Sequence, residues 1–275
     1  VSILTSMKFN YVKKYPATAY FILTFLISWS GAFILVAPEL LKRKPITTLD
    51  GILMFPIMLI GPPVASLILT SVTGGKPALR NLGRHLRTWA PVKWFLLPLL
   101  IFPCLILTTL LLLHFVSPVF APNFFSIGFL FGIPAGILEE IGWTGFAFRA
   151  LHEKKGFFKS AVILGMIWAL WHLPAIDFLG AARPHGQWLP LFFLSFAALL
   201  VGVRLLIAWM YTCTGSIPLA QFTHAVSTGC LVTFGAAHIT PAQEALWYGV
   251  YALLLWIVVM TILRIKKNIA FHTSQ

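Results

Sequence analysis

Long apolar runs separated by short polar connections dominate this chain. Eight of the runs approach the ~20 residues that a helix needs to cross a ~30 Å hydrocarbon core. They are residues 17–37, 51–72, 93–116, 124–148, 160–176, 189–211, 216–236 and 243–264. The pattern therefore predicts an all-α, polytopic bundle of about eight transmembrane helices. The Gly-Pro-Pro sequence at 61–63 predicts a kink in the second helix, which neighbouring helices tolerate inside a membrane.

The composition excludes a soluble globular protein. The 275 residues are 59% hydrophobic and only 10% charged, whereas typical soluble domains carry about 25% charged residues. The loops are too short for a further domain, so we expect one domain over residues 1–275 with a motif-bearing core at about 124–236. The first apolar run is longer than the apolar region of a signal peptide, and we expect it to be a retained anchor. Met7 is a candidate start residue.

The positive charge of the chain follows a topological pattern. Twenty Lys and Arg residues oppose seven Asp and Glu residues, which gives a net charge of +13. With eight spans, fifteen of the twenty cations fall on the side of the N-terminus, the even-numbered loops and the C-terminus. By the positive-inside rule, both termini are predicted to be cytoplasmic. We therefore expect an integral multi-pass membrane protein, with the lipid bilayer and no nucleic acid as partner.

One basic segment has its own pattern. Residues 76–92 place Arg80, Arg84 and Arg87 among leucines at helical spacing. This spacing predicts an amphipathic helix that lies on the anionic inner leaflet of the membrane.

Away from the ends of the apolar runs, five ionisable residues stand out, at depths where a charge costs at least ~2.5–3.5 kcal/mol. They are Glu139, Glu140, His172, Arg204 and His224. At ~1.5 Å per residue, the depths of Glu139, His172 and His224 from their cytoplasmic helix ends are roughly 18, 20 and 14 Å. Three different helices thus bring a carboxylate and two imidazoles to a similar level, which predicts a site within the membrane.

The chemistry open to this set is narrow. A buried glutamate is a candidate general base, and two imidazoles can hold a water or stabilise an oxyanion. The reaction class that fits is hydrolysis by an activated water. The same Glu139, His172 and His224 are also a candidate His2Glu set for Zn2+, although no HExxH motif is present. Metal-free activation is equally compatible with these residues, so no cofactor is firmly implied.

The neighbouring residues leave alternatives open. Arg204 either neutralises a buried carboxylate or extends toward the interface. Trp143, Trp168 and Trp171 flank the cluster, and packing explains them as well as a role in the site. The remaining histidines are interpreted as ordinary, namely His85, His114, His152, His185, His238 and His272.

Three segments carry a resemblance to a known family. They read LEEIGWTGFAFRAL at 138–151, LGMIWALWHLP at 164–174 and FTHAVSTG at 222–229. In this order, on three separate apolar runs, they resemble the CPBP family, which comprises type II CAAX prenyl proteases and bacteriocin-processing or immunity relatives. Residues 61–89 also resemble bacterial members in their position before these segments.

The resemblance implies roles for individual residues. Glu139 and Glu140 match the two acids of a Glu-Glu-x-x-x-Arg motif, whose first acid activates the attacking water. Trp168 stands where Phe is usual, four residues before His172. His224 and Thr228 match a His-x-x-x-Asn motif, and the two histidines would hold the water and stabilise the oxyanion.

Two positions depart from the family pattern. Thr144 stands where the family has Arg, and Thr228 where it usually has Asn. Position 144 shares a helix face with Glu140, so an Arg there would form an i,i+4 ion pair that Thr144 replaces with a neutral hydrogen bond. Arg149 lies about 180° around a continuous helix from Glu140, so it is no simple replacement unless Gly145 breaks the helix.

These features give one leading function and two others. We expect an intramembrane endopeptidase that acts in CAAX-type maturation or related membrane proteolysis. Its partner would be a peptide or protein substrate, hydrophobic or lipidated, that reaches the site within the membrane. The departures at Thr144 and Thr228 favour the alternative of a non-catalytic immunity or scaffold protein. A transporter with a buried glutamate as proton relay is a third hypothesis, which the motif order opposes.

Overall fold

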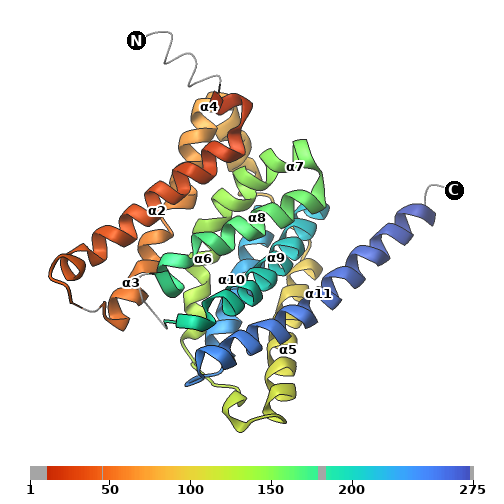
Figure 1. Cartoon of the computed structure of the whole chain (residues 1–275). Coiled ribbons are helices and arrows are strands. Elements are labelled where there is room, and N and C mark those ends of the chain that lie inside the picture. Colours follow the sequence, from red (N-terminus) through yellow and green to blue (C-terminus); the bar gives the residue numbers. More distant parts are fainter. Residues whose placement is uncertain (1–10, 45, 179–183, 273–275) are drawn as a thin grey trace.

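The computed structural model describes residues 11–44, 46–178 and 184–272, and these form a bundle of helices without strands (Figure 1). The prediction of an all-α fold is therefore confirmed for this part of the chain. Met7 and the cations Lys8 and Arg183 lie outside the described residues. The α-helices are α2 (Pro16–Leu41), α3 (Thr48–Met58), α4 (Gly61–His85), α5 (Lys93–His114), α6 (Gly128–Gly142), α7 (Arg149–Lys155), α8 (Phe157–Trp171), α9 (Leu189–Thr214), α10 (Ile217–Phe234) and α11 (Pro241–His272). Short helical turns of other types are η1 (Pro118–Phe120), η2 (Trp143–Phe148), η3 (Pro174–Phe178) and η4 (Gly186–Trp188).

Several segments have the length and apolar content of membrane-spanning helices. In the described part of the chain there are six: Pro16–Leu41, Leu49–His85, Lys93–His114, Phe157–Asp177, Gly186–Thr214 and Pro241–Ile265. The protein is thus an integral multi-pass membrane protein. The other two predicted spans correspond to α6 with η2 and to α10, which are shorter or more polar and carry Glu139, Glu140 and His224. The count of eight and the cytoplasmic position of both termini stay predictions.

The predicted kink in the second span is present. Helix α3 ends at Met58 and α4 begins at Gly61, with prolines in its first turn. The break leaves the carbonyl of Met58 without its helical partner, and the hydroxyl of Ser28 on α2 donates a hydrogen bond to it at 2.7 Å. A neighbouring helix therefore satisfies the backbone group that the proline kink releases, as expected inside a membrane.

The second half of α4 is amphipathic, as predicted. Gly75 at φ +60° divides the helix. Beyond it, Arg80, Arg84 and Arg87 are exposed, while Leu82 is buried against the bundle. Contact of this basic face with an anionic leaflet stays a prediction.

Helices α6 and α10 pack closely at the centre of the bundle (Figure 1). Gly132 and Gly136 lie one turn apart on α6 and face the backbone of α10. A Cβ atom added at Gly132 would lie 2.1 Å from the carbonyl oxygen of Ala225, and one at Gly136 would lie 2.3 Å from that of Gln221. Small residues at this spacing allow two membrane helices to approach backbone to backbone. This contact brings Glu139 and Glu140 on α6 to the level of His224 on α10.

Replacing Gly136 with alanine is expected to destabilise the protein by about 1–3 kcal/mol, since the new Cβ meets backbone atoms that cannot rotate away. Thermal unfolding in detergent measures the effect. Gly83→Ala on α4 is the matched control, because its Cβ would meet nothing within 4 Å. There the higher helix propensity of alanine should leave stability unchanged or slightly raised. Equal melting temperatures for the two variants would contradict the proposed close contact.

Candidate active site

The carboxylate of Glu140 is the centre of a buried polar network. Arg204 on α9 donates to both of its oxygens, from Nη1 to Oε2 at 2.8 Å and from Nη2 to Oε1 at 2.9 Å. The Nδ1 atom of His224 lies 2.8 Å from Oε1, and the hydroxyl of Thr144 donates to Oε2. Glu140 and Arg204 are both 0% exposed. The network thus joins α6, η2, α9 and α10, and it neutralises the charge of Glu140 inside the bundle.

The sequence left two interpretations of Arg204 open, namely neutralisation of a buried carboxylate and extension toward the membrane interface. Of the two interpretations, the structure supports neutralisation of a buried carboxylate. The guanidinium also lies 4.5 Å from the ring centroid of Trp168, in a cation–π contact. Because a buried arginine in an apolar span needs an acidic partner, the sequence already indicated that Arg204 would pair with a carboxylate. The sequence contains no information on which of the two adjacent acids it would meet.

Arg149 does not replace the missing arginine of the motif. Gly145 does not interrupt the chain direction, because η2 continues α6 as a π-helix into α7. Arg149 lines a cleft together with Lys13 and Glu153, whereas Glu140 is bound by Arg204. The sequence-based expectation for Arg149 is confirmed.

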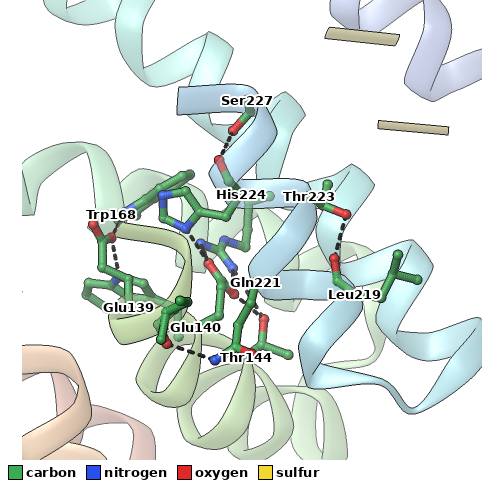
Figure 2. A network of polar contacts seen from close by, with 12 residues as sticks. Glu139, Glu140, Thr144, Trp168, Leu219, Gln221, Thr223, His224 and Ser227 are labelled. Carbon is green, nitrogen blue, oxygen red and sulfur yellow. Dashed lines mark hydrogen bonds and ion pairs between the residues drawn. The ribbon is translucent and has the colours of Figure 1, made fainter. Parts of the chain in front are cut away.

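Glu139 occupies a different environment from Glu140. Its Oε2 atom accepts hydrogen bonds from the indole nitrogens of Trp143, at 3.0 Å, and Trp168, at 2.8 Å. Figure 2 shows Glu139 directed at Trp168, while Glu140 is directed at His224. Among the described residues, no lysine or arginine forms an ion pair with Glu139. Two neutral donors therefore orient this carboxylate without pairing its charge, which suits a general base. Trp143 and Trp168, which the sequence left between packing and function, both contact it.

The two histidines have assigned tautomers. The Nδ1 atom of His172, at the end of α8, lies 2.8 Å from the carbonyl oxygen of Trp168. A carbonyl only accepts, so this nitrogen carries a proton. The same reasoning applies to His224, because Glu140 is held as a carboxylate by Arg204. In both rings Nε2 remains for another partner. The ring of Trp168 lies between them, at 5.6 Å from His172 and 4.9 Å from His224 between centroids.

A cavity of about 220 Å3 opens beside His172. Its wall contains Trp168 and His172 from α8, and Ser227 and Thr228 from α10. The other lining side chains are mostly apolar or aromatic: Phe55, Ile176, Phe196, Leu199, Leu200, Val203, Leu231, Val232, Tyr248 and Tyr251. Thr228 therefore lines the cavity and does not belong to the Glu140 network. Such a mostly apolar cavity with a few polar groups is typical of a ligand site.

The structure does not assemble the candidate zinc site. Within the described ranges, no group of three or more His, Cys, Asp or Glu side chains is arranged to hold a metal ion. Glu139, His172 and His224 thus do not fit Zn2+ in this arrangement.

Comparisons with known proteins match the segments that form this site. Residues 121–230 match the family model described as "Type II CAAX prenyl endopeptidase Rce1-like". A relative from Methanococcus maripaludis, named "CAAX prenyl protease 2", is 26% identical over 187 residues. This match covers 63% of the present chain and 65% of the relative, which is slightly less than two thirds of its length. The family model spans α6, α8 and most of α10, where the three motifs lie, and both matches support the resemblance to the CPBP family that these motifs carry.

Proposed function

We propose that this protein is an intramembrane endopeptidase that hydrolyses a peptide bond with a water activated by Glu139. The observation that carries the proposal is the convergence of Glu139, His172 and His224 around Trp168, from three helices. Trp168 and His172 also line a cavity of about 220 Å3. The family match and the name of the archaeal relative support proteolysis as the reaction. The apolar cavity supports a hydrophobic or lipidated peptide or protein as substrate. The bacterial plasma membrane is its proposed location.

The proposed reaction needs one general base and one hydrogen-bond donor to the oxyanion. Glu139 removes a proton from water, and the hydroxide oxygen forms a bond with the carbonyl carbon of the substrate. The C–N bond of the tetrahedral intermediate then breaks, and the proton held by Glu139 passes to the leaving nitrogen. The products are a carboxylic acid and an amine, so a single water is consumed. His172 presents the Nε2 lone pair that orients the water, because its proton is on Nδ1.

His224 would stabilise the oxyanion. Its Nδ1–H points at the Glu140 carboxylate, and with a proton on Nε2 as well the ring would donate a hydrogen bond to the negative oxygen. Glu140 is then a positioning residue that acts through His224, and Arg204 keeps Glu140 ionised. In this scheme the two adjacent acids have separate roles, set by their partners: indole N–H groups for Glu139 and a guanidinium for Glu140.

The non-catalytic alternative rests on Thr144 and Thr228. The position of Arg204 weakens its first argument, since Arg204 forms the ion pair with Glu140 that an arginine at position 144 would form. Thr228 keeps a hydroxyl in the cavity wall, next to Ser227. The alternative therefore depends mainly on the missing amide of Asn at position 228.

A cleavage assay separates the two functions. The protein is purified, reconstituted into lipid nanodiscs and incubated with a farnesylated peptide and with its unmodified counterpart. Mass spectrometry detects the new termini. Cleavage of either peptide at one bond supports an endopeptidase, and a preference for the farnesylated peptide supports a lipidated substrate. If neither peptide nor a membrane-spanning peptide library is cleaved, the proposed hydrolysis is wrong and the immunity or scaffold function is favoured.

A further inference from the structure

A second buried ionic cluster lies outside the proposed catalytic network. His185 is 3% exposed and precedes η4. Its Nδ1 atom lies 2.8 Å from Oδ1 of Asp177 on η3, and its Nε2 atom lies 3.5 Å from Oε2 of Glu244 on α11. The backbone N–H of His185 also donates to Asp177, at 2.6 Å. By sequence alone His185 is interpreted as ordinary, since it lies near a span end and apart from the other ionisable residues of the core.

Two carboxylates on one imidazole favour its doubly protonated form. A neutral ring has one N–H and one lone pair, so one of the two carboxylates would face a lone pair. An imidazolium satisfies both. Burial by itself lowers the pKa of His185, but the Glu244 and Asp177 carboxylates outweigh it, so the pKa is raised above its ordinary value. A further titratable side chain near this cluster is Tyr248 of α11, which contacts the ring of Phe192.

Ring contacts and backbone bonds connect this cluster to His172. His185 stacks on Phe192 with centroids 3.7 Å apart, and Phe192 stacks on Phe196, whose ring meets the edge of His172 at 5.5 Å. A second connection runs along the chain, where the amides of Ala175 and Ile176 bond the carbonyl of His172 at 3.0 and 3.1 Å. Ile176 lines the cavity and directly precedes Asp177.

We infer that Asp177, His185 and Glu244 form a clamp that holds η3, the start of η4 and α11 together and thereby positions His172 and the adjacent cavity wall. The clamp is strongest when His185 carries both protons. It joins the segment after His172 to two further helices at the end of the cavity. His185 is a positioning residue, since it acts on the site through Phe192, Phe196 and η3. The effect of the clamp on hydrolysis rests on the proposed function, whereas its effect on the geometry of His172 does not.

The direction of the pH dependence follows from the raised pKa. A group with a raised pKa in the folded state contributes stability below its unfolded pKa of about 6.5, and this contribution is lost as the pH rises through the folded value. Glu244→Gln removes one of the two carboxylates and keeps the shape of the side chain. We expect it to lower the midpoint of the His185 titration by about one pH unit, a tenfold change in proton affinity.

The test uses the full chain, labelled with 15N-histidine, in lipid nanodiscs. The ring signals are assigned with His172→Gln and His185→Gln. In the wild type, the signal of His172 should change with the midpoint of His185, and Glu244→Gln should move both midpoints together. Glu153→Gln, an exposed acid on α7, is the matched control and should move neither.

If the midpoint of the His172 signal is the same in Glu244→Gln as in the wild type, the proposed clamp is wrong, even if the melting temperature changes. The pH profile of peptide cleavage is the second measurement. Its alkaline limit should move to lower pH in Glu244→Gln, and an unchanged profile with moved NMR midpoints would reject the link to hydrolysis. If the wild type cleaves nothing at any pH, the proposed function has failed, and the NMR midpoints still decide the clamp.

Discussion

Changing Glu139 to glutamine is expected to lower peptide cleavage by about 100-fold to 10,000-fold, the range that general bases contribute. An amide cannot remove the proton from water. The geometry should survive, because the carbonyl oxygen of Gln accepts the same hydrogen bonds from Trp143 and Trp168 that Oε2 of Glu139 accepts. Folding should therefore remain intact while the reaction is lost. The rate of cleavage in nanodiscs and the melting temperature are measured on the same samples.

Glu153→Gln is the control, since it removes an equal charge from the exposed face of α7. It should retain wild-type cleavage. If Glu139→Gln retained it as well, Glu139 would not be the base. A loss of cleavage accompanied by a large fall in melting temperature would contradict the expectation that the indole bonds preserve the site.

Changing Arg204 to glutamine is expected to have the largest effect on stability. It leaves the carboxylate of Glu140 buried without its cation, which costs about 3–5 kcal/mol in comparable buried pairs. Glu140 would then bind a proton, and the Nδ1–H of His224 would lose its charged acceptor. We therefore expect a lower melting temperature and a lower cleavage rate in the protein that remains folded.

Thr144→Arg provides the rescue. Position 144 is one turn after Glu140, and Thr144 already contacts its carboxylate. An arginine there restores the ion pair from the same helix, as in the family motif. Alone, Thr144→Arg brings a second guanidinium against one carboxylate and should destabilise the protein. Combined with Arg204→Gln it should recover part of the lost stability and cleavage, which a double-mutant cycle measures. Strictly additive losses would show that Arg204 does not act through Glu140.

Much of the fold follows from the order of residues alone. Apolar runs of helical length predict the membrane helices, and the Gly-Pro-Pro sequence at 61–63 predicts the break before α4, because proline removes a backbone donor. The burial of Leu82 between exposed arginines follows from helical periodicity. These properties depend on residues near each other in the chain, which is why the sequence suffices.

Some residues of the site can also be predicted from the local sequence. Charged residues are costly in an apolar span, so Glu139, Glu140, His172, Arg204 and His224 stand out. Their partners are not local. Arg204 is 64 residues from Glu140, and Trp168 is 29 residues from Glu139. Which acid meets the guanidinium depends on the rotation of α6 against α9 and α10.

The sequence by itself determined that this chain is a membrane helix bundle with ionisable groups in its core. Only the tertiary structure decided which partners each of these ionisable groups meets. The close contact at Gly132 and Gly136 sets the depth and rotation of α6, and this turns Glu140 toward Arg204 and His224 and Glu139 toward two indoles. Separately, the packing of α11 against η4 places Glu244 beside His185. Helical periodicity specifies which residues share a face, whereas the packing of helices distant in sequence determines what each face meets.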